Sequence, residues 1–124
     1  MKRLIVHEAR VIHIAWVESQ DKYEFRLLYG KQFLTPTLWL SPAEWQKLFA
    51  WGTIVLSDFK GEEWLSLNRE GRVMTITPHR KFDYGCGVSF ERGTWPKVEF
   101  QDLYQLAKEE RGGVLPETGW NRHF

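Results

Sequence analysis

Residues 30–52, GKQFLTPTLWLSPAEWQKLFAWG, carry the strongest local signal in the chain, a strand that runs into a capped helix. Ser41 is predicted to be the N-cap, with Pro42 at the first helical position and Glu44 three residues after the cap. At this spacing the hydroxyl accepts one amide at the helix start and the carboxylate reaches back to another. The stretch therefore predicts a helix over residues 42–50.

The predicted helix has one apolar face. Trp45, Leu48 and Phe49 recur at helical spacing, so we expect them on the side that meets the core. Leu40 and Trp45 have the spacing of a hydrophobic staple around the cap, and Gly52 is expected to end the helix. No catalytic signature accompanies this motif, which predicts architecture and not activity.

The composition is that of an ordinary globular chain. Its 124 residues, 43% hydrophobic and 27% charged, suit one domain with its own core. Seventeen Lys and Arg against 16 Asp and Glu give a net charge of +1, so binding to nucleic acid needs a local basic surface. The chain lacks the run of roughly 18 apolar residues that spans a membrane, and its start does not resemble a signal peptide. We expect a cytoplasmic protein that does not enter a membrane.

Aromatic residues make up 15% of the chain and include seven Trp. A core of this size can hold many of them. The surplus can also line a binding face, since Trp and Tyr suit surfaces that are apolar on one side and wet on the other. Both interpretations stay open for each aromatic residue.

Strand patterns dominate both halves of the chain. In residues 23–29 Tyr23, Phe25, Leu27 and Tyr29 point one way and the residues between them the other, a period of two that predicts a half-buried strand. Pro36 predicts an edge position or a bulge in its strand. The predicted strands are residues 4–6, 10–17, 23–29, 33–40, 53–59, 63–67, 72–77 and 84–91, with a hairpin turn at 68–71 and a basic loop at 79–83.

A second helix is predicted over residues 99–111. Phe100, Leu103, Tyr104 and Ala107 form its apolar stripe, and Gly112–Gly113 closes it. The order of strands, helix, strands, helix predicts an α+β fold of antiparallel sheets with two helices. The pattern also suggests a duplicated β-β-β-(β)-α unit, with pseudo-repeats at 4–52 and 53–112 inside a single domain of residues 1–113, followed by a C-terminal tail, residues 114–124.

Residues 23–52 resemble the strand–strand–helix core of the Whirly-type single-stranded nucleic-acid binders, which include the positive-cofactor coactivators and the Pur-alpha repeats. The matching elements are the turn Gly30–Lys31, the apolar strand at residues 38–40, and the helix start Ser-Pro-x-x-Trp at residues 41–45. The doubled order of strands and helix is similar to the Whirly and Pur-alpha arrangement. The resemblance covers about thirty residues as a motif and the whole chain as a topology.

This resemblance implies a protein that binds single-stranded DNA or RNA on a sheet face. Short divergent binders of this kind are common in viruses and mobile elements, so we expect such an origin. Bases would stack on aromatic rings while Lys and Arg follow the phosphates. The candidate residues are Tyr23, Phe25, Arg26, Tyr29, Lys31, Arg72, Arg80, Lys81, Phe82, Tyr84, Arg92, Trp95 and Lys97. If the hypothesis holds, Arg26, Lys31, Arg72, Arg80 and Lys81 share one face with aromatic side chains between them.

The alternative is a small protein–protein interaction module, of the inhibitor, immunity or regulatory kind, that docks through an aromatic patch. A near-neutral charge suits this hypothesis, which requires an apolar patch without a continuous basic rim. Exposed strand edges need cover, so a homo-oligomer is expected under either hypothesis.

Nothing in the sequence indicates catalysis or a bound metal or cofactor. His7, His13, His79 and His123 lack the paired spacing of metal ligands. The single Cys86 excludes a disulfide within the chain and a zinc site built from cysteines, and no base or oxyanion hole for it is evident. We therefore expect a binding protein without metal or cofactor, and not an enzyme.

Overall fold

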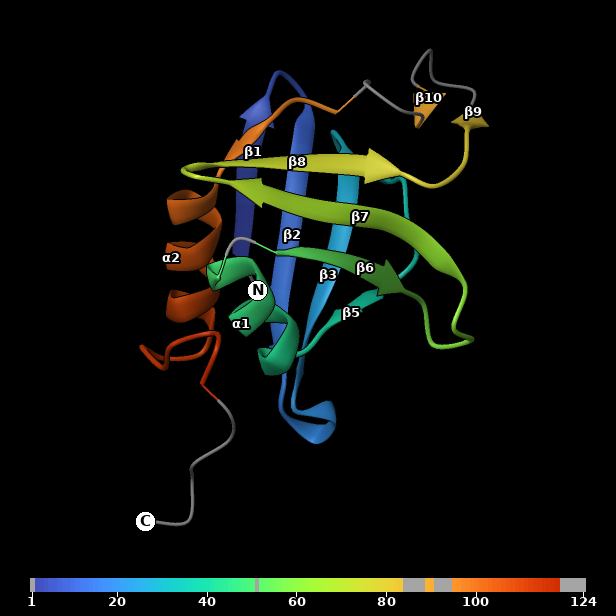
Figure 1. The fold of residues 1–124 in the computed structure, drawn as a ribbon. Helices are drawn as coiled ribbons and strands as arrows, with labels where there is room; N and C mark the ends of the chain where they lie inside the picture. The colour runs from blue at the N-terminus through green and yellow to red at the C-terminus, as the bar shows by residue number, and fades with distance from the viewer. Residues whose placement is uncertain (1, 51, 84–88, 91–94, 119–124) are drawn as a thin grey trace.

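The computed structural model describes residues 2–50, 52–83, 89–90 and 95–118. It has the predicted α+β fold, with antiparallel sheets and two helices (Figure 1). The first half of the chain contains β1 (Lys2–His7), β2 (Arg10–Val17), the 3-10 helix η1 (Glu18–Gln20), β3 (Lys22–Tyr29), β4 (Gln32–Phe33), β5 (Leu38–Leu40) and α1 (Pro42–Phe49). The second half contains β6 (Thr53–Ser57), β7 (Glu63–Glu70), β8 (Val73–Pro78), β9 (Phe82–Asp83), β10 (Ser89–Phe90), β11 (Val98–Glu99) and α2 (Phe100–Glu110).

One nine-stranded sheet runs through both halves in the order β1-β2-β3-β5-β6-β7-β8-β11, and β4 pairs with β3 beside this path. The two halves meet where Trp39 of β5 pairs with Ser57 of β6. Strands β9 and β10 form a separate two-stranded sheet. In Figure 1, β6, β7 and β8 run crosswise to β1, β2 and β3, so the long sheet bends over on itself.

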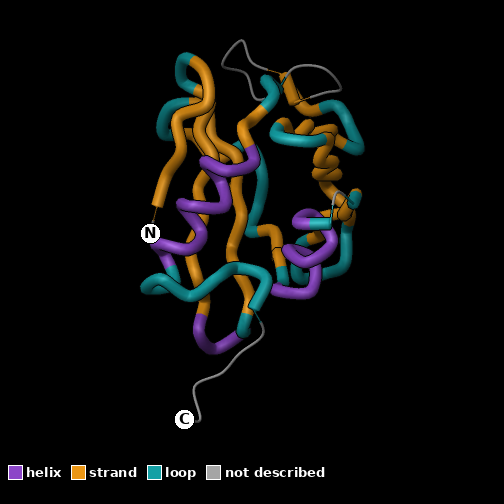
Figure 2. Tube along the Cα trace, turned by 60° about the vertical axis from the view of Figure 1, so that its left-hand side comes forward, coloured by secondary structure: helices purple, strands orange, loops and turns teal. Residues whose placement is uncertain are grey.

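The core fills the space between the two halves of this sheet. After the rotation of Figure 2 the strands form two groups, one on each side of the view. Buried side chains come from the inner faces of both groups, for example Ile14 and Phe25 from one and Leu65 and Ile76 from the other. Trp45 of α1 is fully buried among them.

Helix α1 begins as predicted. Ser41 accepts a hydrogen bond from the Glu44 amide at 3.2 Å, and Glu44 accepts one from the Ser41 amide at 2.9 Å. After the helix ends, the Gly52 amide donates to the Lys47 carbonyl at 2.7 Å. A Cβ at position 52 would lie 2.8 Å from that oxygen, too close for a side chain. Glycine therefore allows the backbone to pass this near to the last turn of the helix.

Replacing Ser41 with alanine is expected to lower the free energy of unfolding by about 1 kcal/mol, because the first turn of α1 loses one side of its capping box. Ser41→Asp, which keeps an acceptor at the cap, serves as the control and is expected to retain most of that stability. Urea unfolding followed by circular dichroism measures both variants. Equal losses in the two variants would show that the cap hydrogen bond contributes nothing.

Some predicted boundaries were wrong. Residues 33–40 are not one strand, because Pro36 lacks an amide for the ladder and β4 and β5 are separate pieces. Strand β7 continues to Glu70, so the hairpin turns around Gly71, whose φ is +64°. The loop at 79–83 contains β9, and within the strand predicted at 84–91 the described part is β10.

Candidate nucleic-acid interface

Three of the predicted binding residues belong to the core. Tyr23 and Phe25 are fully buried and Trp95 is 6% exposed, so none of these rings can stack on a ligand. The Tyr23 hydroxyl donates to the Ala107 carbonyl at 3.2 Å, and burial raises the pKa of Tyr23 to about 12. The alternation in β3 was predicted correctly, but its aromatic side faces the core. The prediction of these three as stacking residues was therefore wrong.

Arg26 lies on the opposite face of β3 and does meet an aromatic ring. Its guanidinium carbon is 3.4 Å from the centroid of the Phe33 ring, and Nη2 donates to the Thr35 carbonyl at 3.4 Å. Lys31 is exposed in the turn before Phe33. Tyr29, by contrast, is half-buried against the core, with the guanidinium of Arg10 5.7 Å from its ring.

The basic residues around β8 divide between its two ends. Arg80 and Lys81 follow the strand, and the Arg80 guanidinium lies 5.2 Å from the Trp64 ring and pairs with Glu62. Arg72 precedes the strand and pairs with Glu99 at 3.5 Å. Eight residues of extended chain separate Arg72 from Arg80, about 26 Å.

Arg72 therefore lies at the opposite end of β8 from Arg80 and Lys81. Lys97 also lies apart, next to β11 at the edge of the sheet. The side chain of Phe82, and residues Tyr84, Arg92 and Cys86, lie outside what the structure describes.

A shallow hollow of about 190 Å³ lies where the two halves of the sheet join. Trp39 of β5 and Lys22 of β3 line it together with Ser57 and Asp58 at the end of β6. Trp39 is half-buried and points away from the core, since its neighbours Leu38 and Leu40 are the buried residues of β5. Trp39 and Lys22 thus line the same hollow at the surface.

The turn between β6 and β7 displays an aromatic side chain beside this hollow. Phe59 at its tip is 81% exposed, with the Lys60 ammonium 5.8 Å from its ring. Asp58 holds the turn: Oδ1 accepts the amides of Lys60 and Glu62, and Oδ2 accepts the Trp64 indole N–H at 3.2 Å. Burial alone would raise the pKa of Asp58, but these hydrogen bonds lower it below its usual value.

These contacts link four aromatic side chains. Three of them have a Lys or Arg beside the ring, and the fourth, Trp39, shares its hollow with Lys22. Asp58 lines the hollow and accepts the indole N–H of Trp64. On the other side of the hollow, Trp39 pairs with Glu24 in the β3–β5 ladder, and Arg26 follows two residues further along β3. We call this surface the aromatic–cation band. Its pairs are Phe33 with Arg26, Trp39 with Lys22, Trp64 with Arg80, and Phe59 with Lys60.

Buried polar residues support the Arg26 end of the band. His13 of β2 is 1% exposed, and its Nε2 lies 3.1 Å from Oε1 of Glu24. The ring meets Phe33 edge-on, with centroids 6.3 Å apart. Nδ1 is buried without a hydrogen-bond partner in the described structure, which fits a neutral imidazole that donates from Nε2 to Glu24. Burial, the largest influence, lowers the pKa of His13 and outweighs the carboxylate of Glu24, and the charges of Arg3 and Arg26 lower it further.

The His13 environment predicts how stability depends on pH. Because the folded pKa lies below the unfolded value of about 6.5, the unfolded chain takes up the proton first as the pH falls. The free energy of unfolding is expected to fall as the pH drops below about 6.5, by at most about 1.4 kcal/mol per pH unit from this group. Urea unfolding at pH 7.5 and 5.5 measures the loss, and His13→Gln should reduce it. If the parent protein and His13→Gln lose the same free energy of unfolding between the two pH values, other titratable groups cause the loss.

Six members of the band were missed in the sequence analysis: Lys22, Phe33, Trp39, Phe59, Lys60 and Trp64. A signal for three of them was present. In LWL and EWLSL the Trp alternates with Leu residues that are buried, so it lies on the other side of the strand. Phe59 precedes the glycine turn at Gly61, where a solvent-exposed position is common. Nothing in the sequence brings these short segments together.

The described residues contain no group of three or more His, Cys, Asp or Glu side chains placed to hold a metal ion. Neither described helix has the length and apolar character needed to cross a membrane. Comparison with models of known protein families, with curated proteins and with solved structures gave no significant match.

Proposed function

We propose that the chain binds single-stranded nucleic acid along the aromatic–cation band. The observation that supports this proposal most is that three rings of the band have a Lys or Arg beside them and that Trp39 shares its hollow with Lys22. Proteins that bind single strands combine stacking rings with cations that follow the phosphates, and both are needed in alternation along the strand. The band provides this alternation over the junction of the two halves of the sheet.

The hollow beside Trp39 is the strongest position for a base. A base stacked on the indole would lie beside Lys22, whose ammonium group can meet the phosphate, while the Ser57 hydroxyl offers a hydrogen bond at the edge of the base. Lys31 and Lys81, which are exposed near the two ends of the band, would extend the contact with the backbone.

The carboxylates of the band are engaged in structural roles. Glu24 accepts from His13, Glu44 caps α1, Asp58 holds the β6–β7 turn, and Glu62 pairs with Arg80. Glu62 lowers the positive charge available at Arg80, so a phosphate would compete with it there. Glu62→Gln is therefore expected to strengthen binding.

Fluorescence anisotropy with labelled oligo-dT, oligo-U and a DNA duplex tests the proposal. We expect binding to the single strands and not to the duplex. With four phosphate contacts, affinity should fall about 50-fold between 50 and 200 mM salt. Lys60→Ala with Arg80→Ala should weaken binding and reduce that salt dependence.

Arg72→Ala with Lys97→Ala is the matched control, because both side chains are exposed cations outside the band. It should change affinity little. No binding of either single strand at tens of micromolar protein in low salt would overturn the proposal. Equal losses of affinity in the two double variants would show that the binding site lies outside the band.

Two further parts of the proposal concern the setting. We propose that the protein acts in the cytoplasm. We also propose that a virus or mobile element encodes it, since short divergent single-strand binders are common there. We also propose that copies of the chain associate, which the 52% exposure of Phe49 on α1 supports. Light scattering during size-exclusion chromatography measures the oligomer.

A further inference from the structure

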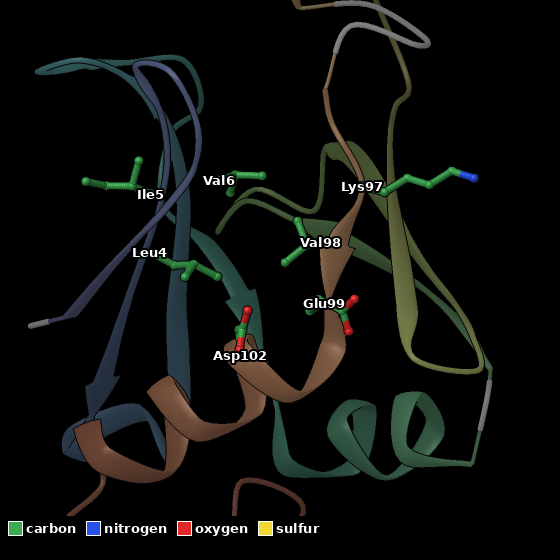
Figure 3. Close-up of a pocket in the computed structure, with 7 residues that line it drawn as sticks. All are labelled: Leu4, Ile5, Val6, Lys97, Val98, Glu99 and Asp102. Atoms are coloured by element: carbon green, nitrogen blue, oxygen red, sulfur yellow. The ribbon is translucent and has the colours of Figure 1, made fainter.

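The two end strands of the long sheet lie on either side of a pocket. β1 pairs with β2 and β11 pairs with β8, and in the described sheet each of these end strands has one unpaired edge. Side chains of both strands line one pocket of about 150 Å³, whose floor is the start of α2 (Figure 3). We call this gap between β1 and β11 the seam.

The seam has apolar walls and an acidic floor. Val6 of β1 and Val98 of β11 extend toward the pocket from opposite sides, with Leu4 beside Val6 (Figure 3). Asp102 in the first turn of α2 points up from below, and Lys97 points away. Asp102 forms no ion pair with another described residue.

The other side of the β1 edge is also apolar. Ile5 points away from the pocket in Figure 3 and is 71% exposed. Its partner across the ladder is Val11, which pairs in turn with Leu28, and Leu28 with Phe33. Ile5 is thus the open end of an apolar row on the outer face of the sheet.

We infer that the seam binds an extended peptide of another protein, which adds to β1 as a strand. Unpaired amides and carbonyls at a strand edge are satisfied by a further strand, and the side chains of that strand alternate between its two faces. One side chain would enter the pocket between Val6 and Val98, and the next would cover Ile5. This site is separate from the aromatic–cation band and does not depend on nucleic-acid binding.

A single peptide fits the seam better than a second copy of this chain. Because the same small pocket touches both β1 and β11, the gap accommodates a narrow occupant. The β1 of a second copy would bring its own β2 alongside, where β11 lies.

The charge of the seam selects the peptide. Asp102 points into the pocket, whereas the ammonium group of Lys97 points away from it and Glu99 pairs with Arg72. A Lys or Arg on the face that enters the pocket, two positions from the inserted apolar residue, would reach Asp102. The recognised pattern is therefore two adjacent apolar residues followed or preceded by a basic one.

Selection of displayed random dodecapeptides on the full-length chain tests the inference. We expect enrichment of the apolar-apolar-basic pattern. A synthetic peptide from the selection should slow hydrogen exchange at β1 amides. Its affinity should fall about two- to fivefold with Asp102→Asn, as expected for an exposed ion pair, and also with Ile5→Thr. Methylation of alternate peptide amides, which blocks strand pairing, should abolish binding.

Glu109→Gln is the matched control, since Glu109 is an exposed carboxylate near the opposite end of α2, and it should leave the affinity unchanged. Failure to enrich any peptide would overturn the inference. The inference would also be overturned if Asp102→Asn and Ile5→Thr left the affinity of the enriched peptides unchanged, or if these peptides did not slow hydrogen exchange at β1 amides. If the chain without peptide forms dimers and Ile5→Lys dissociates them, the β1 edge binds a second copy of the chain instead.

Discussion

Replacing Trp45 with alanine is expected to lower the free energy of unfolding by about 3–5 kcal/mol, the largest effect of any single substitution considered for this protein. Trp45 is fully buried, and its ring makes edge contacts with Tyr23, Phe100 and Tyr104 at centroid distances of 5.8–6.2 Å. These partners come from β3 and α2. The cavity left by alanine would therefore loosen α1 from both the first half of the sheet and the second helix.

Guanidinium unfolding and thermal melting measure this loss, which corresponds to roughly 10–20 °C in Tm for a chain of this length. Trp45→Phe is the control. The indole N–H of Trp45 is buried without a hydrogen-bond partner among the described residues, so phenylalanine removes an unsatisfied donor while it keeps most of the ring. A Trp45→Ala loss below about 1 kcal/mol would contradict the central packing role of this residue.

Replacing Trp39 with leucine is expected to weaken single-strand binding by about 5- to 100-fold, the cost of one lost base stack. Trp39 lines the hollow between the halves of the sheet, and leucine retains an apolar side chain without a stacking face. Tryptophan emission should be quenched by oligo-dT in the parent protein and less so in the variant. Anisotropy titration at low salt gives the affinities.

Trp16→Leu is the matched control for Trp39→Leu. Trp16 is also half-buried and also has an arginine against its ring, with the Arg111 guanidinium 3.8 Å from the centroid, but it lies outside the band. Its replacement should leave affinity unchanged once folding has been confirmed by circular dichroism. Loss of binding in Trp16→Leu with none in Trp39→Leu would move the interface away from the band.

The proposed single-strand site on the aromatic–cation band and the proposed peptide site at the seam lie on different parts of the surface. The band follows the outer face at the junction of the halves, where rings and charges alternate. The seam lies at the ends of the sheet, where β1 and β11 each have one edge without a pairing strand among the described residues and the walls are apolar.

Elements with a strong local pattern were predicted correctly from the sequence. Ser41, Pro42 and Glu44 define the start of α1 by hydrogen bonds within four residues, and Gly112 and Gly113, with φ of +68° and +95°, end α2 as expected. The strands with clean alternation were also found, because the period of two follows directly from the geometry of an extended chain. Boundaries failed where pairing partners decide them, as in β4 and β5.

By itself the sequence determined the α+β class, the two helices and which residues of each strand share a face, since these depend on contacts between near neighbours in the chain. It did not determine which face is buried. Tyr23 and Phe25 have the alternation of a binding face, yet the fold buries both of them. Trp39 and Trp64 lie at the same turn, on either side of Asp58, because β5, β6 and β7 pair. The tertiary structure decided the site because a binding surface consists of residues brought together by long-range pairing, and the local pattern of one strand contains no information about its partner.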